Sequence, residues 1–372
     1  MKPANKIRVG IVGAGNWAEY GHIPVLKHLP DYAITALYSR SPDKAAAMAQ
    51  RHDIPHTPAS LDALVQHPEV DLVLALNPAP SHEAVVRAAI AHGKDIYSEW
   101  PLTPSTASSR ALLTLADTAK VRHVVGLQRR LGADYRYIRD LLADGYIGEL
   151  RSVRLHVSVE YFQKLRKASL YFTVPEENFS SLLSIYGGHF LDAIFTMLGH
   201  PDSINALLVN QFKEVTLIET GETLPHMLAD QVLLSGTFPN GAVLSVHLEA
   251  GKRNNFGMQL DLTGSEGDLK MWNRTSFGDA FNIIEGARGD GQALQVLPVP
   301  ARYSWLGGTP PGGTPLGGSP LELASLYAAH ARDVREGSRT APSFADAVAM
   351  HELLDRIDSA SRSGQRVALT GR

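Results

Sequence analysis

The first third of the chain alternates short apolar runs with amphipathic stretches. Runs rich in Val, Ile and Leu predict strands at residues 7–12, 33–38, 71–76, 95–97 and 123–127. Between them, apolar residues recur with helical spacing at residues 43–52, 60–65, 81–92 and 105–119, and Ser81 and Ser105 are candidate helix caps. A helix that connects two parallel strands covers one face of their sheet. The alternation therefore predicts an α/β domain with a doubly wound parallel sheet at residues 1–128.

The pattern changes after residue 128. Helices are expected at 134–144 and 188–198. Apolar and polar residues alternate at 150–160, and further strands are expected at 204–210, 230–238, 242–249, 258–263 and 268–272. We predict an α+β domain at residues 129–372 with a mostly antiparallel, open-faced sheet. The Gly- and Pro-rich stretch 307–321 is interpreted as a loop, because helix patterns resume after it. The helices at about 320–361 are expected to pack on the first domain or near the seam between domains.

Composition excludes several classes of function. The 372 residues are enough for two domains, and 35 basic against 38 acidic residues give a net charge of −3 without blocks of one sign. We therefore expect neither nucleic-acid nor membrane binding, and the absence of cysteine excludes disulfides and Cys-ligated metals. The N-terminus lacks a secretory pattern, which predicts a cytoplasmic protein. No metal site is expected, because Pro55 separates the His52 and His56 pair.

A glycine pattern follows the first predicted strand. Residues 13–18 read Gly13-Ala-Gly15-Asn16-Trp17-Ala18, which is Gly-x-Gly-x-x-Ala. In such a loop Gly13 permits the tight turn, Gly15 lets the backbone approach a diphosphate, and Ala18 lets the next helix approach the strand. The N-terminus of that helix offers N–H groups to phosphates. Because the pattern lies between a predicted strand and a helix in an alternating domain, it predicts dinucleotide binding.

The end of the second strand indicates which dinucleotide is preferred. NAD sites usually carry an acid there, which binds the ribose 2′-hydroxyl. Here the strand ends in Ser39 and Arg40, with Lys44 a turn later. These groups suit a 2′-phosphate, and we predict NADP as the preferred cofactor over NAD.

Later motifs add a resemblance to a known family. Asn77-Pro78 followed by His82, then Gly93-Lys94 followed by Glu99-Trp100-Pro101, resemble the Gfo/Idh/MocA oxidoreductases, whose pattern is Thr-Pro-x-x-x-His and Gly-Lys-x-x-x-x-Glu-Lys-Pro. Further matches lie at 126–130, 145–150, 187–192 and 264–267. The resemblance implies a nicotinamide cofactor bordered by Asn77, Pro78, His82, Glu99, Trp100, Pro101 and Gln128. It also implies a sugar or cyclic polyol substrate.

The resemblance places His189 at the cleft between domains as the candidate base. Asp192 shares its helix face and is expected to orient the imidazole or bind a substrate hydroxyl, and Tyr186 is a second proton-relay candidate. Subunits of this fold are expected to form homo-dimers or homo-tetramers through the C-terminal sheet.

Two departures from the family pattern leave other functions open. Trp100 replaces the family's lysine, and Ile185 stands where catalytic members carry an acid. The Glu-Trp pair resembles a subgroup that includes a yeast galactose-regulon repressor. A catalytically silent NADP-binding regulator or scaffold is therefore the alternative to a dehydrogenase, and NAD-assisted glycoside cleavage ranks below both.

Overall fold

The structure is a computed structural model that describes residues 6–254, 256–277, 282–303 and 316–369. It divides into two compact units. The first unit combines the described residues of Met1–Gln128 with those of Trp305–His351, and the second combines Arg129–Ser304 with Glu352–Arg372.

The first unit is built on a five-stranded parallel sheet. Its strands are short and lined with buried Val, Ile and Leu, as expected for a sheet covered on both faces. Their order is β2 (Tyr32–Tyr38), β1 (Ile7–Val12), β3 (Leu72–Ala75), β4 (Asp95–Ser98) and β5 (His123–Val125). The order reverses at β1, so the carboxyl ends of β1 and β3 flank the point where such sheets bind ligands. The prediction of a doubly wound parallel sheet is confirmed.

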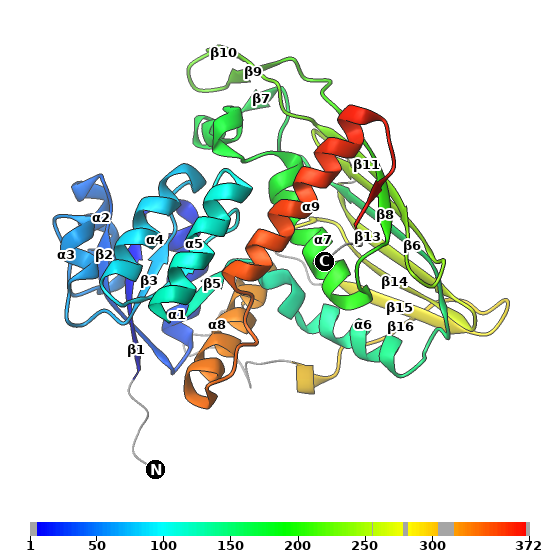
Figure 1. Cartoon of the computed structure of the whole chain (residues 1–372), viewed down its shortest axis with the longest axis horizontal. Helices are drawn as coiled ribbons and strands as arrows, with labels where there is room; N and C mark the ends of the chain where they lie inside the picture. Colours follow the sequence, from blue (N-terminus) through cyan, green and yellow to red (C-terminus); the bar gives the residue numbers. More distant parts are fainter. Residues whose placement is uncertain (1–5, 255, 278–281, 304–315, 370–372) are drawn as a thin grey trace. The chain divides into compact units, whose positions relative to one another are not determined.

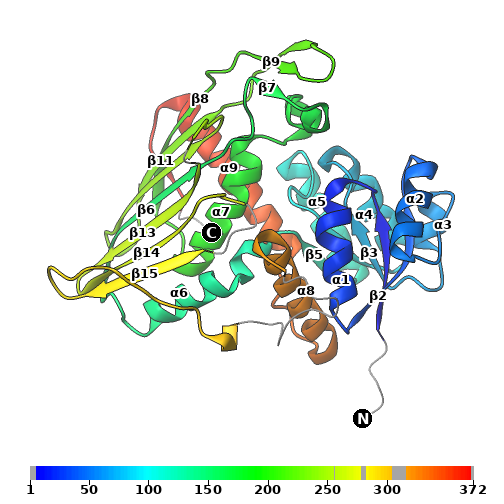
Figure 2. The same ribbon diagram turned by 180° about the vertical axis from the view of Figure 1, so that it is seen from behind.

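Helices cover both faces of this sheet. Figures 1 and 2 show α4 and α5 on one face and α1 on the other. The helices that connect the strands are α1 (Ile23–His28), α2 (Pro42–His52), α3 (Leu61–Val65), α4 (His82–Ala91) and α5 (Thr106–Ala119). Ser105 caps α5, because its side chain accepts a hydrogen bond from the Ser108 N–H at 3.2 Å. The predicted cap at Ser81 is wrong, since Ser81 ends a 3₁₀ turn and makes no capping bond.

The second unit contains a nine-stranded sheet. One face of each long strand is buried and the other is exposed, which produces the alternation seen in the sequence. Its order is β16 (Gln295–Val296), β15 (Ile283–Arg288), β14 (Gly267–Asn273), β13 (Gly257–Gly264), β6 (Leu150–Ser158), β12 (Val243–Glu249), β11 (Gln231–Thr237), β8 (Ser203–Val209) and β17 (Val367–Ala368). Neighbouring strands are antiparallel except β12 and β6. The predicted mostly antiparallel sheet is confirmed.

Two helices of the second unit lie along one side of this sheet, α6 (Ala133–Ala143) and α7 (Gly188–Leu198), as Figure 1 shows. The stretch Glu176–Leu198, which ends in α7, is apolar and long enough to span a membrane by length and composition. Sixty-seven per cent of its most apolar 18-residue segment is buried inside the protein. It therefore serves as the core helix of this unit.

A small sheet in the second unit was not predicted. It orders β10 (Thr223–Pro225), β9 (Glu214–Leu217) and β7 (Leu165–Arg166). These strands have two to four residues, too few to show a period-2 pattern. Tyr161 and Tyr171 beside them are each 48% exposed.

The C-terminal helices divide between the units. α8 (Gly318–Glu336) and the first part of α9 (Phe344–Ser363) belong to the first unit, and the chain passes to the second unit after His351. The Val125 N–H donates to the Pro342 carbonyl at 2.9 Å, which ties this segment to β5. The structure thus differs from a simple division at residue 128. Most of the predicted loop 307–321 lies outside the described residues.

Candidate functional site

The glycine loop in the first unit has the backbone that a dinucleotide site requires. Gly13 has φ +122°, and a Cβ on it would lie 2.9 Å from the Leu76 carbonyl group, so only glycine fits. A Cβ on Gly15 would meet nothing within 4 Å. Ala18 is buried and begins a π-helix, Ala18–His22, that continues into α1. The loop therefore leaves open space beside Gly15, where a ligand's diphosphate could approach.

Asn16 and Trp17 follow the loop in different environments. Asn16 is exposed, whereas the Trp17 ring packs edge-on against Tyr20 at 5.0 Å between ring centroids. A Cβ on Gly21 would lie 2.5 Å from the Trp17 ring. Gly21 is thus needed for Trp17 to lie along the π-helix, a role that sequence analysis did not identify.

The end of β2 presents two cations. Ser39 is half-buried and accepts a hydrogen bond from the Ser41 N–H at 3.3 Å. Arg40 and Lys44 are exposed and form no ion pair with any described residue. Lys44 lies in the first turn of α2, whose N–H groups also favour an anion. Two exposed cations therefore follow β2, with Asp43 between them in the first turn of α2.

In the first unit, two buried side-chain amide oxygens have no partner among the described residues, Oδ1 of Asn77 and Oε1 of Gln128. Asn77 follows β3, and Gln128 follows β5 at the end of the first unit. A buried acceptor without a donor costs about 1–3 kcal/mol. Ribose hydroxyls and the nicotinamide carboxamide are donors that would remove this cost. The neighbouring Pro78 is exposed.

His82 joins two segments of the predicted site through its ring. Nε2 lies 2.5 Å from the Asn77 carbonyl oxygen, and Nδ1 lies 2.9 Å from that of Pro101. Burial lowers the pKa of His82, so the ring stays neutral and donates one N–H at a time. Because both ring nitrogens contact backbone carbonyl oxygens, His82 helps to position the segments that carry Asn77 and Pro101.

Glu99 accepts two hydrogen bonds on one oxygen. The Tyr97 hydroxyl donates to Oε1 at 2.6 Å, and His22 Nε2 lies 2.8 Å from the same atom. The Tyr327 hydroxyl lies 2.7 Å from His22 Nδ1. Burial, reinforced by the Glu99 charge, raises the pKa of Tyr97 and Tyr327 well above the usual value, so both phenols keep their protons. Tyr327 therefore donates to Nδ1, and the ring proton sits on Nε2 facing Glu99.

Sequence analysis missed His22, Tyr97 and Tyr327. Tyr97 and Glu99 stand two residues apart along a strand and its extension, a spacing that puts side chains on one side and could have indicated the pair. No local signal links His22 with Tyr327, which lie 305 residues apart in the chain.

Trp100, in place of the family's lysine, is buried in the first unit. Its ring lies 4.8 Å from that of His351, between centroids. Burial lowers the pKa of His351 to about 4, so it stays neutral at neutral pH. Pro101 follows and is buried. The indole thus packs as part of the wall of the first unit.

In the second unit, His189 lies inside a longer helical segment than predicted. A π-helix, Leu182–Gly187, runs directly into α7, and Ser181 caps it in a capping box with Ser184. His189 is buried and packs edge-on against Phe277 at 5.0 Å between centroids. Ile185, at the family's acid position, is half-buried in the π-helix. Such π-helical turns are frequent at functional sites.

Asp192 forms an ion pair with Arg130. Arg130 donates through Nε to Oδ2 at 2.8 Å and through a second nitrogen to Oδ1. Next to it, the fully buried Arg129 stacks its guanidinium 4.2 Å from the Phe190 ring centroid. The expectation that Asp192 orients His189 or binds a substrate hydroxyl stays a prediction. Arg129 and Arg130 belong to the motif at 126–130, which could have indicated a role for them.

Tyr186 is held in its protonated form. Its ring is buried and packs against Phe190 and Phe277. Burial raises its pKa far above the usual value. The hydroxyl can donate a hydrogen bond but is unsuited to taking up a proton as a phenolate.

Comparison with known proteins agrees with this architecture. Residues 7–127 match the family model described as oxidoreductase family, NAD-binding Rossmann fold. Residues 135–273 match the model of the Gal80p C-terminal domain.

Two curated relatives and one solved structure are similar over much of the chain. The dehydrogenase aclE of Aspergillus oryzae is 32% identical over 59% of this chain, which spans 63% of aclE. The galactose/lactose metabolism regulatory protein GAL80 of Saccharomyces cerevisiae is 27% identical over 76% of this chain and 70% of its own length. A structure of levoglucosan dehydrogenase with NADH and levoglucosan covers 99% of this chain and 100% of its own, with 20% identity and a TM-score of 0.83. Residues 7–127 are therefore similar to the NAD-binding domain of the oxidoreductase family, and residues 135–273 are similar to the C-terminal domain of Gal80p.

Proposed function

We propose that this protein is an NADP-preferring oxidoreductase that acts on a sugar, a sugar derivative or a cyclic polyol. The observation that carries the proposal is the fit of the first unit to a dinucleotide. Gly15 borders open space. The side-chain oxygens of Asn77 and Gln128 are buried and accept no hydrogen bond from any described residue. Glu99, fixed by His22 and Tyr97, adds an oriented carboxylate for a ribose hydroxyl. Trp17, Trp100 and His82 shape this site through packing and backbone contacts.

The preference for NADP rests on Arg40 and Lys44. Both are exposed and form no ion pair with a described residue, and no acid ends β2. An Arg40→Asp variant is expected to lower the ratio of NADP to NAD affinity by at least about tenfold, because it replaces attraction by repulsion. Lys120→Asp, at an exposed position after α5, is the matched control. An unchanged ratio in Arg40→Asp would refute the assignment.

The chemistry of the reaction falls to the second unit. A bound nicotinamide supplies or accepts the hydride, and a protein group must remove or return the proton of the substrate hydroxyl. We propose that His189 removes or returns this proton. Asp192 is held by Arg130 and offers fixed oxygens that can accept hydrogen bonds from substrate hydroxyls. Tyr186 acts as a donor, since burial keeps its phenol protonated.

Turnover with a carbohydrate panel tests the proposal. The purified protein is incubated with NADP⁺ or NADPH and sugars, sugar lactones, keto sugars and inositols, and the nicotinamide absorbance is followed. A substrate-dependent change is expected for at least one member. Tight cofactor binding without any turnover would contradict the enzymatic assignment.

A second candidate function is a regulator that binds NADP without chemistry. The specific observations are the buried Trp100 and the apolar Ile185 at two positions of the family's catalytic pattern, together with the Gal80p-like second unit. This function predicts a protein partner whose affinity changes with NADP. Capture of partners with and without NADP, beside the carbohydrate panel, separates the two. Assembly through the C-terminal sheet and a cytoplasmic location remain predictions.

A further inference from the structure

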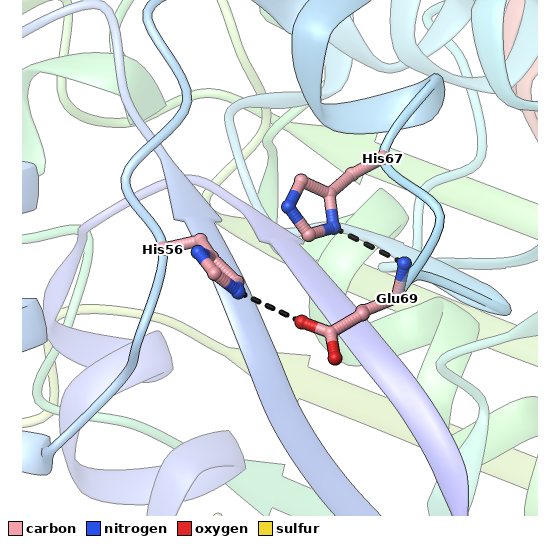
Figure 3. A group of neighbouring side chains, drawn as sticks. All are labelled: His56, His67 and Glu69. Atoms are coloured by element: carbon pink, nitrogen blue, oxygen red, sulfur yellow. Dashed lines mark hydrogen bonds and ion pairs between the residues drawn. The ribbon is translucent and has the colours of Figure 1, made fainter.

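Three potential metal ligands gather at the edge of the first unit, and the proposed oxidoreductase site does not use them. His56, His67 and Glu69 each offer a ligand atom, and these atoms lie within 4.8 Å of one another (Figure 3). His56 Nε2 lies 2.8 Å from Glu69 Oε2, and the two imidazole centroids are 4.4 Å apart. Two imidazoles and one carboxylate form a donor set that suits zinc and other divalent transition metals.

Hydrogen bonds to the main chain hold the backbone of each of these three residues in place. His56 forms a parallel bridge to β2, with its N–H donating to the Thr35 carbonyl at 3.2 Å. The Thr35 hydroxyl in turn donates to the Glu69 carbonyl at 2.6 Å. His67 lies in the turn after α3, where the Lys94 ammonium donates to its carbonyl at 3.3 Å. A site whose ligands are already gathered loses little conformational entropy when an ion binds.

We propose that His56, His67 and Glu69 bind one Zn²⁺ ion at the surface of the first unit. The ion takes the place of the proton between His56 Nε2 and Glu69 Oε2, and the ring proton of His56 moves to Nδ1. His67 supplies Nδ1, whose lone pair accepts a 3.2 Å hydrogen bond from the Glu69 N–H in the metal-free protein; zinc replaces this hydrogen bond, and the Glu69 N–H turns to water. Water completes the coordination on the exposed side.

The required movement is small. Ligands at zinc distances in a tetrahedron lie about 3.3 Å apart, so the present spread of up to 4.8 Å must close by about 1.5 Å. The His56 and Glu69 side chains are 40% and 53% exposed and can rotate. The expectation of no metal site rested on His52 and His56, whereas the structure pairs His56 with residues from the connection between α3 and β3.

Calorimetric titration with ZnCl₂ tests the site. The full chain is prepared without a polyhistidine tag, treated with a chelator and dialysed into a non-coordinating buffer. His56→Gln and His67→Gln remove one ligand each, and His92→Gln is the control because His92 is an exposed histidine outside the cluster. Visible absorption of a Co²⁺ titration reports the coordination geometry, since tetrahedral cobalt absorbs far more strongly than octahedral cobalt.

The expected result is one Zn²⁺ per chain in the wild type and in His92→Gln, with affinity at least about tenfold weaker in both cluster variants, because each loses one of three protein ligands. Zinc is also expected to raise the unfolding temperature of the wild type but not of His67→Gln. No stoichiometric binding, or equal binding in all four proteins, would overturn the proposal. Neither result bears on nicotinamide binding, which the same samples can report separately.

Discussion

His22 Nε2 lies 2.8 Å from Oε1 of Glu99, and both residues belong to the first unit. The π-helix after the glycine loop brings His22 to this position, so one segment shapes the diphosphate cradle and also holds the carboxylate. Tyr327 of α8 supplies the proton that fixes the tautomer of the ring. A helix from the C-terminal part of the chain thus helps to orient a residue of the proposed cofactor site.

Replacing Tyr327 with Phe is expected to weaken cofactor binding. The variant removes the donor to His22 Nδ1 and leaves a buried acceptor, which costs about 1–3 kcal/mol of folding free energy. Because the ring is then free to shift its proton, Glu99 loses its fixed donor, and NADPH affinity is expected to fall about tenfold. Calorimetry with NADPH and thermal unfolding measure the two effects.

Tyr32→Phe is the matched control for this variant. The Tyr32 hydroxyl is also buried and lies 2.8 Å from both the Tyr327 carbonyl oxygen and His330 Nδ1. Its loss should lower stability by a similar amount but leave NADPH affinity within about twofold. Equal losses of NADPH affinity in both variants would show that the hydrogen bond between Tyr327 and His22 affects cofactor binding only through the stability of the fold.

Gly126→Ala is expected to displace Glu99 and its hydrogen-bond donor Tyr97 by steric overlap. A Cβ there would lie 2.7 Å from the Tyr97 hydroxyl and 3.1 Å from Glu99 Oε2. The overlap with Tyr97 should destabilise the protein by about 1–3 kcal/mol. Removing that hydroxyl in the Tyr97→Phe/Gly126→Ala double variant makes room. The double variant should therefore be more stable than additivity predicts, as measured by denaturant unfolding of all four proteins. Additive free energies would place the two residues out of contact.

His189→Ala is expected to abolish turnover and keep cofactor affinity within about twofold, because the base acts on substrate and the dinucleotide site lies in the other unit. His200→Ala, at the exposed end of α7, is the control and should retain full turnover. Steady-state rates with the best substrate of the carbohydrate panel give the comparison. Full activity in His189→Ala would remove this residue from the mechanism.

Stability is expected to fall as pH is lowered from 7 to 5. Burial lowers the pKa of His351 and His330 to about 4 in the folded protein, whereas the unfolded chain keeps the ordinary value near 6.5. Between these values the unfolded state binds more protons, so each group contributes stability that is present above pH 6.5 and lost toward pH 4. Each accounts for a loss of about 2 kcal/mol between pH 7 and 5.

Denaturant unfolding at several pH values checks this expectation. His351→Leu keeps an apolar side chain against Trp100 but removes one titrating group. Its pH-dependent loss of stability should be smaller than that of the wild type by about 2 kcal/mol. The same dependence of stability on pH in both proteins would show that burial does not lower the pKa of His351.

Local patterns predicted the fold well where elements are long or buried. β1 runs from Ile7 to Val12 as expected, because four of its six residues are Val or Ile and a glycine loop follows it directly. β11 and β12 show the alternation that their half-exposed sheet requires. The short strands β7, β9 and β10 carry too few residues for such a signal, and the assignment of α8 to the first unit depends on contacts across the whole chain.

In the candidate site, too, local motifs were predictable from the sequence and contacts between distant elements were not. Gly13 was predictable, since a motif after a strand needs its left-handed backbone. The partners of named residues were not predictable, because they come from distant elements. The ion pair of Asp192 with Arg130 was not predicted, because helical spacing indicates only neighbours on the same helix. The contacts of the His82 ring with two backbone carbonyls were not predicted either, and its place beside the cofactor stays a prediction.

Calorimetry of nucleotide-free protein with NADPH, on the wild type and on Gly15→Val, tests the central claim most directly. A side chain at Gly15 meets open space in the folded protein, so Gly15→Val should keep the unfolding temperature. The same side chain would fill the space where the diphosphate approaches, and affinity should fall by at least about 100-fold. One NADPH bound per wild-type chain, with binding lost in a stably folded Gly15→Val, is the predicted result. No binding by the wild type, or equal binding by both proteins, would contradict the account.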